Sequence, residues 1–133
     1  MFGLFRKKSA SPERAGLIDD FRKASEELRV ADPLARIKVG MTINTASSAF
    51  AYTFKGPSGF QAISRNAQLE YMKKVKTAEE LAHSNRDGEA ALGFGLFNMW
   101  LCALIEKDNE LMTLIQPELT KLSKEADAIQ SEL

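Results

Sequence analysis

The chain has 133 residues and equal numbers of acidic and basic residues, 18 of each, so its formal net charge at pH 7 is zero. Hydrophobic residues make up 44% and charged residues 27%, which is typical of a globular protein and excludes a wholly disordered chain. With one cysteine and one histidine, the sequence excludes an intramolecular disulfide and the usual zinc sites.

The N-terminal segment, residues 1–10, is expected to be a flexible tail that precedes a single helical domain over residues 11–133. Its aromatic and basic side chains suit weak, reversible contact with an anionic membrane surface. These candidate contact residues are Phe2, Phe5, Arg6, Lys7 and Lys8.

The first helix is predicted to begin at Ser11-Pro12, because serine is a good N-cap and proline suits the first helical position. Apolar residues then recur at helical spacing up to Leu28, and charged residues occupy the other faces. The helix is expected to end near Ala31, and Asp32-Pro33 repeats the start signal.

Residues 36–55 fit two structures. Apolar and polar residues alternate from Ile37 to Asn44 and again from Phe50 to Phe54, which is typical of a β-hairpin. Val39, Ile43 and Phe50 also fall at helical spacing, and the centre lacks a hairpin turn signal. We favour a buried helix because the neighbouring segments are clearly helical and an isolated hairpin is marginally stable.

A further helix is predicted after Ser64, which can act as its N-cap. Its basic residues Lys73, Lys74 and Lys76 belong to a basic half of the chain. Residues 1–76 carry 14 Lys and Arg against 7 Asp and Glu, and residues 77–133 carry 4 against 11. This asymmetry indicates either two halves that neutralise each other or a face that binds anions.

Residues 90–105 are predicted to form the central helix of a bundle, because apolar side chains cover almost every helical face. Gly93 and Gly95 are expected to allow close approach of a neighbouring backbone. The near-apolar run of about 24 Å is short for a membrane span, so we interpret it as a core helix.

The C-terminal segment has the most regular pattern of the chain. Its apolar residues, spaced alternately by three and four, are Met112, Ile115, Leu119, Leu122, Ala126, Ile129 and Leu133. This heptad stripe predicts an amphipathic helix, which Pro117 either kinks or restarts. We take Ile115, Leu119, Leu122, Ile129 and Leu133 as the candidate interaction surface.

No catalytic, cofactor-binding or metal-binding residue is predicted. Glu80 and His83 have a ligand-like spacing, but a carboxylate-bridged metal bundle needs a second such motif, and the chain has no second histidine. Cys102 lies in an apolar run and is expected to be a buried, unreactive thiol. No phosphate-binding loop is present.

We therefore expect an all-α, compact bundle of four to five helices. The leading hypothesis is a non-enzymatic, cytoplasmic interaction or assembly protein that binds a protein partner or itself through the C-terminal stripe. The first alternative is a regulatory or inhibitor-type protein that binds an anionic target, a membrane surface or less favourably a nucleic acid, through its basic face. The second is an enzyme with an unrecognised polar pocket.

Overall fold

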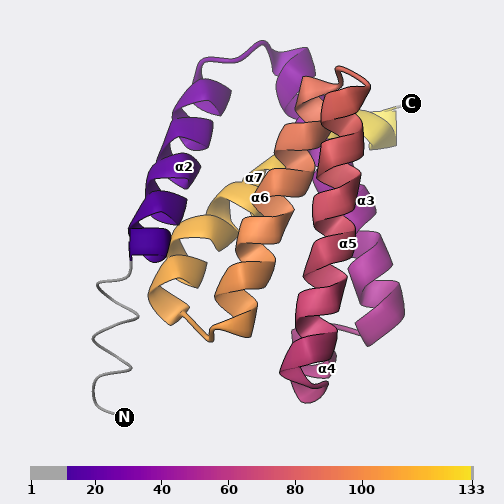
Figure 1. Ribbon diagram of the computed structural model, residues 1–133. Coiled ribbons are helices and arrows are strands. Elements are labelled where there is room, and N and C mark those ends of the chain that lie inside the picture. The colour runs from indigo at the N-terminus through magenta and orange to yellow at the C-terminus, as the bar shows by residue number, and fades with distance from the viewer. Residues whose placement is uncertain (1–11, 133) are drawn as a thin grey trace. The chain divides into compact units, whose positions relative to one another are not determined.

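The computed structural model describes residues 12–132 and is all-α: six helices and no strand lie within that range (Figure 1). The prediction of a helical protein is therefore confirmed. The chain forms two compact units, one ending at Val30 and the other beginning at Ala31. The single domain expected over residues 11–133 stays a prediction, and the tail lies outside the described residues.

The first unit contains one helix, α2 (Pro12–Arg29). It starts at the proline that marks the predicted first turn, and Leu17, Phe21, Ala24 and Leu28 share one face of it at helical spacing. Its other faces carry charged residues, including the ion pair of Glu26 with Arg29. It is therefore the amphipathic helix that the sequence predicts.

The second unit contains five helices: α3 (Pro33–Phe54), α4 (Pro57–Ala62), α5 (Arg65–Ser84), α6 (Gly88–Ile105) and α7 (Asn109–Glu132). Residues 36–55 are thus helical except for Lys55, and the hairpin alternative is wrong. The physical reason is the helical spacing of Val39, Ile43 and Phe50, which places all three in the core.

Short polar side chains start four of the helices by accepting backbone N–H groups, as capping residues do. Asp32 accepts from Leu34, Ser64 from Ala67, Asp87 from Ala90, and Asp108 from Leu111, at 3.0–3.2 Å. Lys55 ends α3 in the left-handed conformation, with a φ of 69°. The starts of these four helices therefore have a local cause in the sequence.

Helix α6 is the centre of the second unit and contacts α3, α4, α5 and α7. It runs beside α5 (Figure 1). A Cβ built at Gly93 would lie 2.7 Å from Thr42 Cβ and 3.1 Å from the Val39 carbonyl oxygen. The predicted close approach is confirmed at this glycine, where α3 and α6 meet.

Among the described residues, α6 alone is long and apolar enough to cross a membrane, and 44% of it is buried. It has helical neighbours in α3, α5 and α7. Packing within the second unit therefore accounts for the buried part of its apolar surface.

Candidate functional site

The C-terminal stripe that we expected to bind a partner lies largely in the protein's own core. Ile115, Leu119 and Leu122 are buried on α7, which packs against α3 and α6. Ile115 and Leu122 have no exposed surface in this fold, and Leu119 has only a small exposed fraction. Ile129 is 39% exposed, and Leu133 lies outside the described residues. A heptad stripe has the same spacing whether it faces a partner or the core, so the sequence did not distinguish the two.

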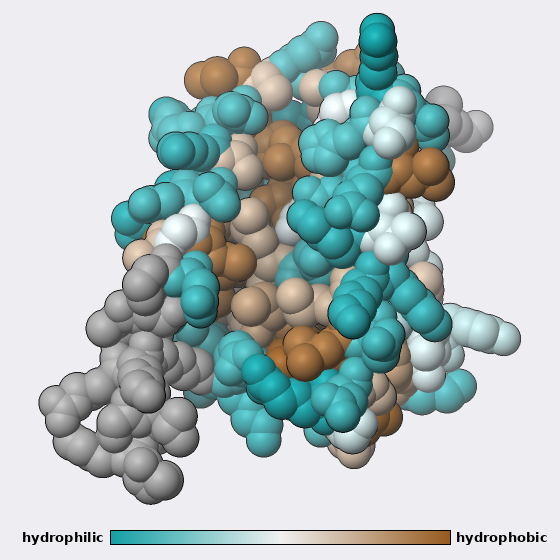
Figure 2. Space-filling view, viewed as in Figure 1, coloured by the Kyte–Doolittle hydropathy of each residue, from teal (hydrophilic) through white to brown (hydrophobic). Residues whose placement is uncertain are grey.

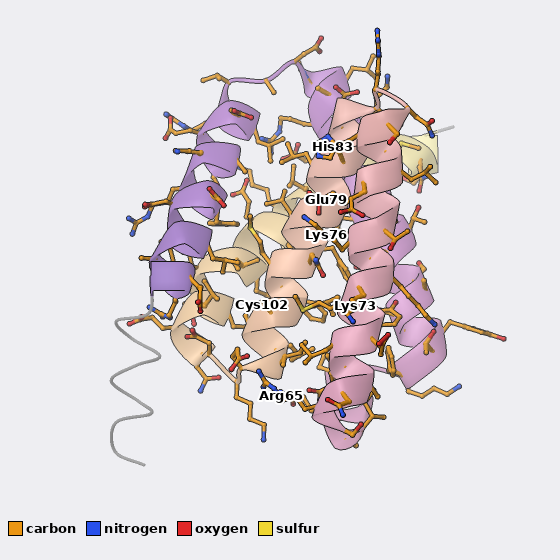
Figure 3. All side chains as sticks on the ribbon, viewed as in Figure 1. Arg65, Lys73, Lys76, Glu79, His83 and Cys102 are labelled. Carbon is orange, nitrogen blue, oxygen red and sulfur yellow. The ribbon has the colours of Figure 1, made fainter. Side chains whose placement is uncertain are left out.

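The basic residues of α5 lie on its exposed side, as Figure 3 shows for Lys73 and Lys76. Lys73 Nζ lies 3.7 Å from Glu70 Oε1, and Lys76 Nζ lies 3.6 Å from Glu79 Oε1. Lys74 is also exposed. Because carboxylates of the same helix neutralise two of the three lysines, the field that α5 presents to an anion is weak. Phe2, Phe5, Arg6, Lys7 and Lys8 lie outside the described residues.

The outer side of α5 is hydrophilic where it faces the viewer, and apolar atoms gather over the neighbouring α6 (Figure 2). Cys102 lies on α6 (Figure 3) and is half-buried. Burial and then the charges of Glu106 and Asp108 raise the pKa of its thiol. The thiol therefore stays protonated at neutral pH, which makes it a poor nucleophile.

The single histidine is exposed to solvent. His83 has a side chain that is 66% exposed, and its Nε2 lies 3.8 Å from Glu79 Oε2. Among residues 12–132, no group of three or more His, Cys, Asp or Glu side chains is placed to hold a metal ion. Lys76, Glu79 and His83 thus lie in a row on the surface of α5, with an ion pair between Lys76 and Glu79.

Helices α3 and α7 cross at Gly40, and a groove lies between them toward the C-terminal end of α3. The two helices touch at Gly40, where a Cβ would lie 2.2 Å from the Leu122 carbonyl oxygen. One turn further along α3, Asn44 Nδ2 donates to Asp127 Oδ1 at 2.9 Å, and Ser123 donates to Asn44 Oδ1. Next to this contact, the second half of α3 faces residues 116–127 of α7 across a hollow of about 510 Å³.

Aromatic rings form the floor of this groove, which we call the α3/α7 groove. They are Phe50 of α3 and Phe97 and Trp100 of α6, all of them nearly buried. Small side chains, Ser47 and Ala51, make the α3 wall. The remaining lining residues are Ile43 of α3, Gly56 and Pro57 at the start of α4, and Gln116, Leu119, Thr120, Ser123, Lys124 and Asp127 of α7.

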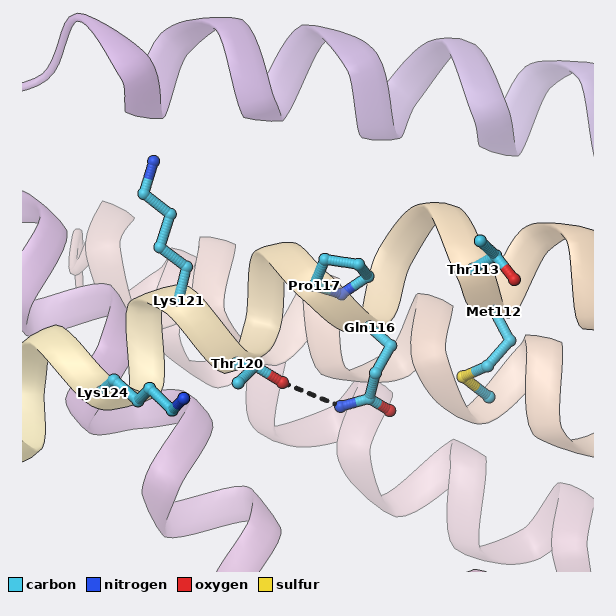
Figure 4. A pocket seen from close by; sticks show the side chains of 7 residues that line it. All are labelled: Met112, Thr113, Gln116, Pro117, Thr120, Lys121 and Lys124. Carbon is cyan, nitrogen blue, oxygen red and sulfur yellow. Dashed lines mark hydrogen bonds between the residues drawn. The ribbon is translucent and has the colours of Figure 1, made fainter.

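A second hollow of about 650 Å³ lies along α7 and shares Gln116, Thr120 and Lys124 with the groove (Figure 4). Pro117 lies in its lining. Gln116 joins the two spaces: its Oε1 accepts the Trp100 indole N–H at 2.7 Å, and its Nε2 donates to Thr120 Oγ1 at 3.1 Å. The two hollows therefore form one concave surface, with a hydrogen-bonded amide at the junction.

The sequence contained one signal for this groove, the run of alanine and serine from Thr45 to Ala51. Small residues on a helix leave space beside a neighbouring helix when that helix diverges. Their partner residues on α7 are about seventy positions away along the chain, so only the fold brings the two walls together. The candidate site therefore differs from the surface expected from the sequence.

No family model, curated protein or solved structure matches this chain.

Proposed function

We propose that this protein is a non-enzymatic, cytoplasmic interaction protein that binds a segment of a protein partner in the α3/α7 groove. The observation that carries the proposal is the groove itself: an open hollow of about 510 Å³ with an aromatic floor and small side chains on its α3 wall. Concave, largely apolar sites with a few polar groups are the usual form of a binding pocket.

The lining suits a peptide better than a nucleic acid. Its only two charged residues, Lys124 and Asp127, have opposite signs, so the groove offers no net attraction to a phosphate backbone. Ser47, Thr120 and Ser123 provide hydroxyl groups at its edge, which can donate to or accept from peptide groups. An apolar side chain of the partner would anchor against the floor, as in helix-in-groove recognition.

Trp100 makes the proposal measurable, because it is the only tryptophan of the chain. Its ring lines the groove, and its indole N–H donates to Gln116, whose side chain lines both hollows. A peptide in the groove must change the surroundings of this ring. Peptides selected from a displayed random library on the wild-type protein are therefore expected to change Trp100 fluorescence on binding.

A matched pair of substitutions on α3 tests where such peptides bind. Ala51→Arg puts a large cation into the groove, and Ala49→Arg makes the same exchange at an exposed position that does not line it. We expect Ala51→Arg to weaken binding about tenfold or more, a loss of about 1.4 kcal/mol, and Ala49→Arg to leave it unchanged. Equal binding to both variants, with both folded by circular dichroism, would show that the groove is not the site.

A further inference from the structure

The outer face of α3 is exposed and carries no charge over more than four turns. Lys38 and Lys55 mark its ends, and none of residues 39–54 between them is charged. Met41 is 42% exposed and Tyr52 is 86% exposed on this face. Exposed helix faces normally carry charged residues, whereas the centres of protein interfaces lack them and are rich in tyrosine and methionine.

The residue types along this face follow nearly the same order from either end. Along the side of α3 opposite its buried residues, the order is Lys38, Met41, Thr45, Ser48 and Tyr52, and Lys55 follows as the C-terminal cap of the helix; all six are exposed. Their spacings of three, four, three, four and three are symmetric. Their chemistry is symmetric as well, with a lysine at each end, a large apolar side chain next, and two small hydroxyl residues at the centre. We call this set the α3 outer stripe.

A symmetric order of this kind suits a two-fold axis. In such a dimer, residue i of one copy contacts residue j of the other copy, and residue j of the first copy contacts residue i of the second. We propose that the protein forms a homodimer in which two α3 outer stripes pack antiparallel. In this register Met41 meets the second copy's Tyr52, a favourable sulfur–aromatic contact. Thr45 meets the second copy's Ser48, and these small side chains let the helix axes approach to about 8 Å, the near end of the usual range.

The lack of charge at the centre of the α3 outer stripe allows the same stripe of a second copy to pack against it. A face that carries one sign of charge along its length places like charges together when it is opposed to itself, and this face does so only at its ends. Lys38 there meets the second copy's Lys55, and because both are exposed the repulsion is small and screened by salt. One helix pair buries less than a standard interface of about 1,600 Å². The dimer is therefore weak and reversible, and it tightens as salt concentration rises.

Sedimentation velocity over a range of concentrations tests the dimer, with two matched threonine variants. Thr45 Oγ1 donates to the Met41 carbonyl at 3.0 Å, and Thr77 Oγ1 on α5 donates to the Lys73 carbonyl at the same distance. Both threonines are exposed. Thr45→Lys puts two cations near the two-fold axis and is expected to weaken dimerisation about tenfold or more. Thr77→Lys is expected to leave it unchanged.

Lysine forms helix at least as well as threonine, so neither variant should lose helical structure. A wild-type protein that stays monomeric at its solubility limit, or a Thr45→Lys variant that dimerises like wild type, would overturn the proposal. The groove is tested separately, because Thr45 does not line it. Thr45→Lys should still bind the groove peptides, so failure of one proposal leaves the other standing.

Disulfide trapping tests the antiparallel register in a Cys102→Ser background. A Thr45→Cys chain mixed with a Ser48→Cys chain should cross-link as a heterodimer, since the register brings these positions within the short Cα separation that a disulfide needs. Either chain alone should cross-link slowly. Rapid cross-linking of Thr45→Cys alone would indicate a parallel pair and contradict the proposed arrangement.

Discussion

The side chains of Arg36 and Glu125 join the first turns of α3 to the last third of α7. Arg36 Nε donates to Glu125 Oε1 at 2.9 Å, and Arg36 Nη2 donates to Glu125 Oε2 at 2.7 Å. The Arg36 side chain is 13% exposed, so the pair is shielded on one side. This bidentate pair fixes the distance between the two helices at the end of α3 away from the groove.

Hydrogen bonding from Arg36 lowers the pKa of Glu125 below its ordinary value of 4.5 in the folded protein. Protonation therefore favours the unfolded chain. The stabilisation is fully present above the ordinary carboxyl pKa and is lost as the pH falls through the lower pKa of the folded state. We expect Glu125→Gln to reduce the free energy of unfolding at pH 7 by about 1 kcal/mol, the upper end for exposed ion pairs.

Urea unfolding of wild type and Glu125→Gln at pH 7 and again below pH 4 checks this prediction. The difference between the two free energies of unfolding should narrow on acidification, because protonated Glu125 loses the negative charge that the variant already lacks. A difference that stays constant with pH would mean that the carboxylate charge contributes nothing to the folded state.

At the scale of the elements, close helix contact depends on a residue without a side chain. Gly40 of α3 lies against the backbone of α7, where a Cβ would lie 2.2 Å from the Leu122 carbonyl oxygen and 3.0 Å from Ala126 Cβ.

Helix α7 continues as one helix through Pro117. Ile115 and Leu119 are buried on either side of the proline, so packing against α3 and α6 holds the helix together where the sequence allowed a new start.

Replacing Gly40 by alanine is expected to destabilise the protein by about 1–3 kcal/mol, the range for overpacking a tight site. The gain in helix propensity, about 1 kcal/mol, offsets only part of this loss because the obstacle is backbone. Gly16→Ala is the control, since nothing lies within 4 Å of a Cβ at that position of α2. It should raise stability by up to about 1 kcal/mol. Equal thermal shifts for the two variants would argue against close α3–α7 contact.

At the scale of the whole molecule, one ring holds the aromatic core of the second unit together. Phe50 lies 5.2–6.1 Å, centroid to centroid, from five other rings. These rings belong to α3, α4, α5 and α6 and are Phe54, Phe60, Tyr71, Phe97 and Trp100. The same ring forms part of the groove floor, so core packing and the candidate site depend on one residue.

Phe50→Ala should lower the free energy of unfolding by about 3–5 kcal/mol, as aromatic-to-alanine changes in cores do. Tyr52→Ala is the control on the same helix, because Tyr52 is largely exposed, and its effect should stay within about 0.5 kcal/mol. Chemical denaturation at a low protein concentration separates this effect from the proposed dimerisation. A similar loss for both variants would show that Phe50 is not central to the core.

The sequence alone determined the features that depend on neighbours along the chain. Asp32, Ser64 and Asp87 cap the helices that follow them, and the periodic apolar residues form the expected helices, because capping and periodicity act over a few residues. For residues 36–55 the sequence allowed both a helix and a hairpin, and the structure shows the helix, with Val39, Ile43 and Phe50 on one buried face.

Only the tertiary structure decided which helix faces remain exposed to solvent. The heptad residues Ile115 and Leu122 lie inside, while the stripe of Met41 and Tyr52 lies outside, although both follow the same three-and-four spacing. The α3/α7 groove likewise depends on how two helices diverge beyond Gly40. Burial is set by the elements that pack on a face, and those elements come from distant parts of the chain.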